Sequence, residues 1–245
     1  VQAARNADFS EVSLRERLPP NLVHVTIAMP SKLAAKPWGP DAFDALPLTL
    51  RALNASYRDK GAPLAPENFQ HLARLKLRSC SIKRLGPITD HAIFSYLPST
   101  LQYLQIRKAI EGLVAEDCKF LPRNLTFLAV YAEPPFDPSV LTYIPPTLRH
   151  LSINFSDLRD EHIRWLPRGL EDLAYRFVEK SHPPTLTVAC VPDLPEHLSL
   201  YTPWNTSRCP AWQAYRAERH KTLHFGMRTP DPRVIRRIHG TSEKK

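Results

Sequence analysis

Aromatic and basic residues alternate with apolar ones in several short segments of this chain. Tyr103 and Arg107 lie on either side of Leu104 and Ile106, and later segments place Phe127 and His150 in the same pattern. Successive side chains of a strand point to opposite faces, so these residues are expected to share one face. Aromatic anchors with a charged border are typical of surfaces that bind proteins. The set predicted to contact a partner is Arg74, Lys76, Arg78, Tyr103, Arg107, Phe127, Tyr131, His150 and Arg176.

Patterns that would support catalysis are absent from the sequence. No glycine-rich phosphate loop, H-E-x-x-H or G-x-S-x-G motif occurs, and there are only 7 glycines. His220 and His224 lie four residues apart but have no carboxylate or thiol nearby in the sequence. We therefore expect a protein that is not an enzyme, with no metal site and no cofactor.

One sequence motif, Leu-Pro-x-x-Leu-x-x-Leu-x-Ile, recurs along the chain. It must position the residues that are predicted to contact a partner. Copies begin at Leu97-Pro98, Leu121-Pro122, Ile144-Pro145 and Leu166-Pro167, with earlier ones at Leu18-Pro19 and Leu46-Pro47 and a weak last one at Leu194-Pro195. Between Pro47 and Pro98 the copy is degenerate: Phe69 takes the proline position, and the strand is expected around Leu75 and Leu77, with Arg74, Lys76 and Arg78 pointing outward. The spacing of 22 to 29 residues indicates stacked repeats.

The repeats resemble those of leucine-rich repeat proteins over about residues 12 to 203. The best match to the family consensus is Leu72-x-x-Leu75-x-Leu77-x-x-Cys80-x-Ile82, which puts Cys80 in the Asn/Cys position. Ile88-Thr89-Asp90, with Ile93 and Leu97, looks like the cysteine-containing subtype, which is familiar from F-box substrate receptors and is similar to a small ATP-synthase-associated subunit. The resemblance implies an α/β solenoid with a curved parallel sheet on the concave side and short helices or irregular segments on the convex side.

The chain departs from this family in the polar position that normally bonds the loops together. That position holds Pro30, Arg58, Ala109, Glu133 and Val178 in the other copies, so something else must replace the buried polar ladder that normally satisfies the backbone groups of the loops. Short helices are expected where an aspartate precedes an apolar residue and can cap free backbone N–H groups. The candidate caps are Asp41, Asp90, Asp117, Asp137 and Asp160.

Cysteines and glycosylation motifs bear on the compartment. Cys80, Cys118, Cys190 and Cys209 form no C-x-x-C pair, which favours a reducing environment, and Cys80 is expected to be a buried small residue. Asn-x-Ser/Thr motifs occur at Asn54, Asn124, Asn154 and Asn205. Asn54 and Asn154 fall on the predicted sheet face, where a glycan would block it, so we interpret these motifs as unused.

Charge divides the chain into two predicted parts. Residues 1–203 are expected to form a solenoid of about seven or eight irregular repeats with a charge of +2, and residues 204–245 a cap and extension with ten basic and three acidic residues, hence +7 of the total +9. Aromatic residues interleave with these charges, as in segments that bind RNA or an acidic surface. The basic residues singled out are Arg216, Arg219, Lys221, Arg228, Arg233, Arg236 and Arg237.

Three functions remain open at this point. The first is a scaffold subunit that binds other proteins of a larger intracellular assembly; the high pI suits the mitochondrion, with the cytoplasm as the alternative. The second is a component of a ribonucleoprotein that holds RNA with its basic tail. The third is a substrate-recognition module of a ubiquitin ligase, which rests on analogy of fold. No apolar run is long enough to span a membrane, and nothing in the sequence indicates a homo-oligomer.

Overall fold

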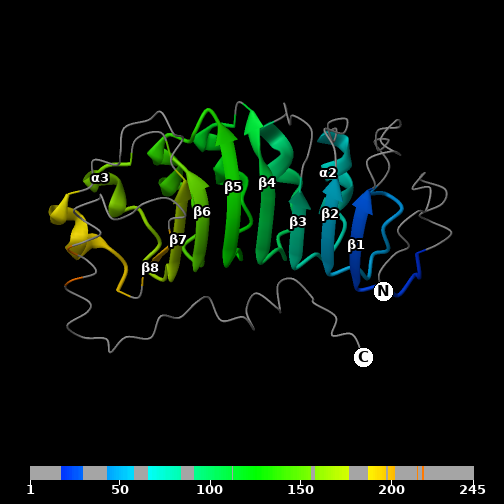
Figure 1. Cartoon of the computed structure of the whole chain (residues 1–245). Coiled ribbons are helices and arrows are strands. Elements are labelled where there is room, and N and C mark those ends of the chain that lie inside the picture. Colours follow the sequence, from blue (N-terminus) through cyan, green and yellow to red (C-terminus); the bar gives the residue numbers. More distant parts are fainter. Residues whose placement is uncertain are drawn as a thin grey trace.

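The computed structural model describes residues 18–29, 43–57, 66–83, 91–111, 113–155, 158–176, 187–196 and 198–201, together with Ala214 and Ala217. Within these residues, eight strands form one parallel sheet in chain order. Figure 1 shows the strands side by side in one layer. The strands are β1 (His24–Met29), β2 (Ala52–Tyr57), β3 (Ser79–Lys83), β4 (Tyr103–Glu111), β5 (Phe127–Glu133), β6 (His150–Asn154), β7 (Asp172–Arg176) and β8 (Ser199–Tyr201).

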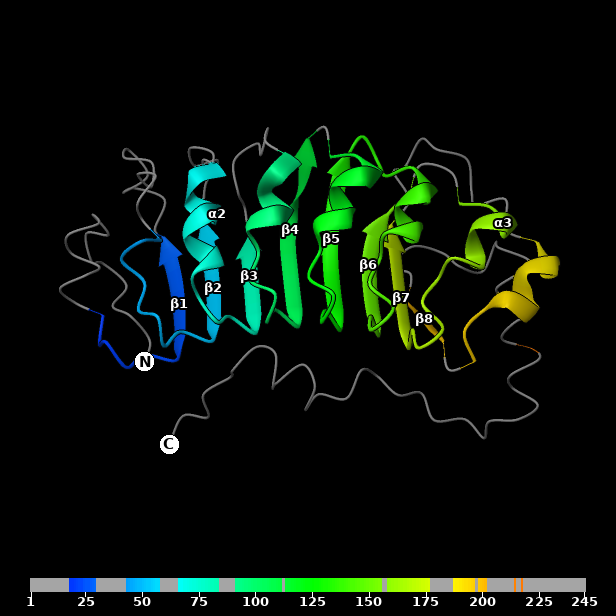
Figure 2. The ribbon, with the colours of Figure 1, turned by 180° about the vertical axis from the view of Figure 1, so that it is seen from behind.

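Short helices connect the strands and cover one face of the sheet, as Figure 2 shows from behind. The helices named within the described residues are the α-helices α2 (Pro66–Ala73) and α3 (Asp160–Ile163) and the 3₁₀ helices η2 (His91–Tyr96), η3 (Ala115–Phe120), η4 (Pro138–Thr142) and η5 (Val188–Asp193). We call the opposite side of the sheet, which carries Tyr103, Phe127 and His150, the open face. Parallel strands in chain order with helices on one side confirm the predicted α/β solenoid.

The hydrophobic core lies between the sheet and these helices. In β4, Leu104 and Ile106 are at most 1% exposed, whereas Tyr103 and Gln105 beside them are half-buried. The leucine three residues after each proline is also buried, as at Leu101 and Leu125. A single strand of this length cannot bury its apolar side alone, so each repeat depends on its neighbours for its share of the core.

The Leu-Pro segments form tight turns that lead into the strands. The Pro98 carbonyl accepts the Leu101 N–H at 3.0 Å, and the prolines at 19, 47, 122, 145, 167 and 195 make the same bond. The weak copy at Pro195 is therefore a true repeat, because it leads into β8. The predicted boundary between residues 203 and 204 lies outside the described residues.

Threonine and asparagine side chains bond four of these turns, those at Pro47, Pro98, Pro122 and Pro145, to the preceding turn. Thr49 Oγ1 donates to the carbonyls of Pro20 and Leu22, both at 2.9 Å, and Thr147 Oγ1 donates to those of Arg123 and Leu125 at 2.7 and 2.8 Å. Equivalent bonds join Thr100 Oγ1 to the Leu77 carbonyl and Asn124 Nδ2 to the Ser99 carbonyl. This ladder lies in the turns that precede the strands, whereas the Asn/Cys position of the family lies towards the ends of the strands, so the ladder does not occupy that position.

The predicted aspartate caps differ in the backbone groups that their carboxylates bind. Asp137 caps η4 as expected, because its carboxylate accepts the Ser139 N–H at 2.8 Å. Hydrogen bonding to the side chain and backbone of Ser139 lowers the pKa of the Asp137 carboxyl. Asp117 lies inside η3 and accepts the Val114 N–H at 2.9 Å. Asp160 instead binds the next repeat, where its carboxylate accepts the Thr187 N–H at 2.8 Å. Asp41 and Asp90 lie outside the described residues.

The third repeat departs from the predicted register. The strand lies at Ser79–Lys83 instead of around Leu75 and Leu77, and Cys80 pairs with Leu104 and Ile82 with Ile106. Cys80 is therefore a core residue of the strand, fully buried as expected, and does not occupy the Asn/Cys position. The prediction that Arg74, Lys76 and Arg78 project from a strand is wrong, because all three precede β3.

Candidate functional site

Three rings lie side by side on the open face, and we call Tyr103, Phe127 and His150 the aromatic row. Strand register brings them together, since Tyr103 is paired with Phe127 and Phe127 with His150. The Tyr103 and Phe127 rings stack with centroids 4.2 Å apart and planes 16° apart. The Phe127 and His150 rings are 6.0 Å apart and tilted by 40°. The repeat thus turns residues more than twenty positions apart in sequence into one aromatic surface.

An acidic residue ends the row. Asp172 is the partner of His150 in the register, and its Oδ2 lies 2.6 Å from His150 Nδ1. The Asp172 side chain is 49% exposed and that of His150 is 32% exposed, so solvent reaches both members of the pair. Asp172 is not among the predicted binding residues, although its place in the repeat, next to His150, was a signal that could have found it.

Small and hydrogen-bonded side chains form the adjoining part of the open face. The hydroxyls of Tyr131 and Ser152 are 2.6 Å apart, and Ser81 Oγ donates to Gln105 Oε1 at 3.2 Å. Ala129, next to Phe127 on the same face, is only 3% exposed. The rings of the row therefore stand beside a polar floor whose groups already bond to one another.

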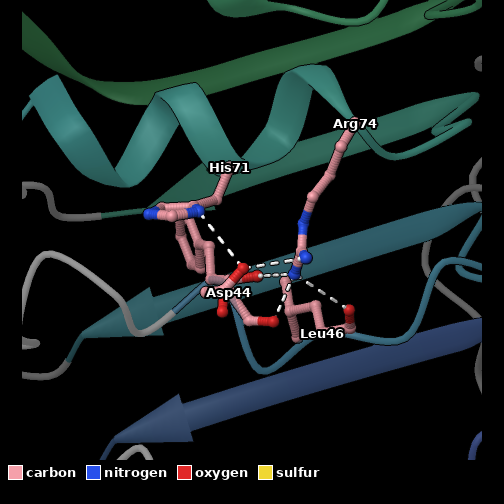
Figure 3. Close-up of polar contacts among 5 residues, drawn as sticks. Asp44, Leu46, His71 and Arg74 are labelled. Atoms are coloured by element: carbon pink, nitrogen blue, oxygen red, sulfur yellow. Dashed lines mark hydrogen bonds and ion pairs between the residues drawn. The ribbon is translucent and has the colours of Figure 1, made fainter.

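Three of the predicted binding residues lie on the turn before β3. Arg74 is the residue that stands where other repeats have proline, because Leu77 and Cys80 align with Leu101 and Leu104. Its guanidinium Nη1 lies 2.8 Å from Asp44 Oδ1, and His71 Nδ1 lies 3.4 Å from the same oxygen (Figure 3). The side chain also donates to the carbonyl of Phe43 at 3.2 Å.

Arg74 thus ties the third repeat to the turn of the second. Beyond Phe43, its Nη2 donates to the carbonyls of Asp44 and Leu46, the second at 3.4 Å. An arginine can serve several oxygens at once because its guanidinium carries five N–H donors in a planar fork. The structure accordingly gives Arg74 a bonding role between repeats, although Arg74, like Lys76 and Arg78, is exposed.

Replacing Arg74 with alanine is expected to lower the free energy of unfolding by about 1–2 kcal/mol, since the bonds it loses are charge-assisted but partly exposed to solvent. Arg74→Lys should recover only part of the loss, because an ammonium cannot span the same carbonyls. Urea denaturation of the purified chain measures both. The exposed Lys76→Ala, two residues away, serves as the control and should change stability by less than about 0.5 kcal/mol. Equal effects of Arg74→Ala and Lys76→Ala would contradict the assignment.

The remaining predicted residues divide between the open face and regions outside the description. Tyr103, Phe127, Tyr131 and His150 lie on that face as expected. Arg107 falls in β4 between Gln105 and Ala109, where the register against β5 shifts. The side chains of Arg107 and Arg176 lie outside the described residues, as do the tail residues Arg216, Arg219, Lys221, Arg228, Arg233, Arg236 and Arg237. The basic border expected around the aromatic row is thus not seen among described side chains, and the row ends in Asp172.

Groups suited to catalysis do not gather in the described part of the chain. No cluster of three or more His, Cys, Asp or Glu side chains there could hold a metal ion. Cys80, Cys118 and Cys190 are buried, and burial raises the pKa of the Cys80 thiol to about 12. No helix within the described ranges is both long and apolar enough to cross a membrane. The aromatic row on the open face is the candidate site.

Comparison with known proteins adds little to this assignment. No family model matches the sequence, and no curated protein matches it. Among solved structures, the leucine-rich repeat-containing protein LegL7 from Legionella pneumophila is similar with a TM-score of 0.38 and 11% identity, over 96% of this chain and 95% of that chain. A likeness of that degree does not by itself indicate the fold or the function of this chain. The class of fold rests on the strand order and register described above.

Proposed function

We propose that this chain is a non-catalytic interaction module that binds a protein partner through the aromatic row. The stacked pair of Tyr103 and Phe127 carries the proposal, because two half-buried rings at 4.2 Å form a rigid apolar platform on the side of the sheet opposite to the described helices. Aromatic residues of this kind dominate the energy of protein interfaces. The hydrogen-bonded floor and the solvent-exposed Asp172 would supply the polar rim.

The wider setting belongs to the same proposal. A scaffold subunit of an intracellular assembly, in the mitochondrion or the cytoplasm, is supported by the solenoid fold and by the sequence pI of about 9.5. The function as a ubiquitin-ligase substrate receptor rests on analogy of fold alone, so it is not developed further.

A ribonucleoprotein component is the second candidate, because residues 204–245 carry a charge of +7. RNA binding through such a segment would fall steeply as salt concentration rises. It predicts that partners are held through RNA and are lost when the RNA is digested.

The test is native capture of the tagged chain from a lysate, with and without ribonuclease, comparing the unchanged protein with Tyr103→Ala/Phe127→Ala. We expect a defined set of proteins that survives ribonuclease and is lost from the double variant. With the identified partner, the dissociation constant should rise by about 30-fold or more, as is usual for an interface hot spot worth about 2 kcal/mol.

Phe120→Ala is the matched control, since Phe120 is 47% exposed but belongs to η3 on the covered side. The Phe120→Ala variant should retain the captured partners. Thermal melting should show that Phe120→Ala and the Tyr103→Ala/Phe127→Ala variant are both folded. Partners that remain bound to the double variant would overturn the proposal, whereas their loss on ribonuclease treatment would favour the ribonucleoprotein.

A further inference from the structure

Three basic residues lie together where the strands begin, and we call Arg51, Lys76 and Arg78 the basic edge. Arg51 directly precedes β2, and Arg78 directly precedes β3. The Arg78 N–H donates to the Arg51 carbonyl at 2.7 Å. They therefore occupy equivalent places in adjacent repeats, about 4.8 Å apart along the solenoid. Lys76 lies in the same turn as Arg78 and, like Arg78, is exposed. The edge is separate from the aromatic row, which lies on β4 to β6.

The fold itself does not neutralise these charges. Among the described residues, none of the three makes an ion pair, and the single side-chain contact is a long one, 3.4 Å from Arg51 Nη1 to the Leu50 carbonyl. Elsewhere on the same edge, Arg149 pairs with Glu171, and Arg168 donates to the Asp193 carbonyl at 3.1 Å. Adjacent like charges repel, so an edge built only for stability would not favour this arrangement.

Lys76 also takes a place that the fold uses differently in other repeats. It aligns with Thr49, Thr100 and Thr147, whose hydroxyls donate to carbonyls of the preceding turn. A lysine here gives up that ladder bond and adds a third, exposed positive charge to the basic edge. The substitution adds positive charge to the surface at the expense of a bond within the fold.

Exposed apolar side chains adjoin the basic edge. Leu48, in the turn before β2, is 62% exposed, and Val23, whose carbonyl accepts the Arg51 N–H, is 42% exposed. No exposed large aromatic side chain lies in these turns within the described residues, so the stacking platform typical of single-stranded nucleic-acid sites is missing there. A mixed apolar and basic surface instead complements an acidic peptide that also carries an apolar residue.

We propose that the basic edge is a second docking surface, which binds an acidic segment of a protein partner. Carboxylates of the segment pair with Arg51 and Arg78, whose planar guanidinium groups can each donate two parallel N–H bonds to a carboxylate. An apolar side chain of the segment covers Leu48 and Val23. The surface acts independently of the aromatic row, so either can fail without the other.

The test measures binding of the full chain to three fluorescent probes: a synthetic peptide of repeated Glu-Asp-Leu units, an oligouridine, and vesicles of phosphatidylcholine with phosphatidylserine. The variant is Arg51→Ala/Arg78→Ala, and the matched control is Arg149→Ala/Arg168→Ala, whose arginines lie on the same edge but have partners in the fold. We expect the variant to weaken peptide binding by about tenfold and the control by less than about twofold. Leu48→Ser should weaken the same probe by a smaller factor.

The comparison between the two double variants separates the site from the general positive charge of the chain, because each removes two arginines. Equal losses in both would overturn the proposal, as would an absence of peptide binding. A greater loss for oligouridine or for vesicles than for the peptide would also overturn it, and would assign the edge to nucleic acid or to an anionic membrane surface. The melting temperature of Arg51→Ala/Arg78→Ala should not be lower than that of the unchanged protein, because repulsion between Arg51 and Arg78 is relieved.

Discussion

Replacing Asn154 with alanine should lower the free energy of unfolding by about 3 kcal/mol, the largest effect we expect from one polar side chain. Asn154 is 6% exposed and ends β6. Its Oδ1 accepts the Ala132 N–H at 2.9 Å, and its Nδ2 donates to the Ala132 carbonyl at 2.8 Å. The amide thus takes the place of a backbone neighbour of β5, and its loss leaves two buried backbone groups without partners. Urea denaturation measures the change.

Asn124→Ala is the matched control for this prediction, because Asn124 is exposed and makes one bond, Nδ2 to the Ser99 carbonyl at 3.0 Å. It should cost less than about 1 kcal/mol. Asn154→Asp adds a check on direction: burial should raise the pKa of the new carboxyl, so this variant should approach the stability of the unchanged protein as pH falls. A loss below about 1 kcal/mol for Asn154→Ala would show that the amide is not the bridge described here.

The buried thiols should be almost inert in the folded protein. Burial raises the pKa of Cys80 from 9.0 to about 12, which lowers the reactive thiolate fraction at neutral pH about a thousandfold. Burial also raises the pKa of Cys118, assisted by Asp117 and Glu116. In a Cys209→Ser chain, we expect no prompt reaction with a disulfide reagent and complete reaction in urea.

Mass spectrometry of the labelled chain identifies which cysteine reacts. The unchanged chain, with Cys209 present, provides the comparison, since that residue lies outside the described part of the structure. Prompt labelling of Cys80 without urea would mean that the third strand is not packed as described. Labelling that follows the unfolding transition would instead support the role of Cys80 as a core residue.

The motifs at Asn124 and Asn154 show how far a local sequence pattern can be trusted. Both satisfy the glycosylation sequence, yet the amide nitrogen that would carry the glycan donates to a backbone carbonyl in each case. The interpretation that these motifs are unused agrees with the hydrogen bonding at the two positions. Asn54 is the residue whose Oδ1 is buried without a partner among the described side chains, and we find no structural role for that atom.

The repeat predicted most of the strands because its physical basis is local. Leucines at fixed spacing must face one side of a strand, and a proline cannot continue a helix, so the pattern located the turns that lead into β4, β5, β6 and β7. The strand of the third repeat was misplaced because Leu75 and Leu77 match the inward strand positions of the consensus as well as Cys80 and Ile82 do. Only pairing with β4, where Cys80 meets Leu104, decides between them.

The sequence by itself determined the kind of fold and the alternation that places Tyr103, Phe127 and His150 on one face. Those properties depend on periodicity, which is written in the order of residues. The tertiary structure alone decided that Arg74 bonds to the second repeat and that Arg51 lies beside Arg78. These are contacts between repeats, and they depend on strand register, which sequence spacing leaves open wherever a repeat lacks its proline or its strand is irregular.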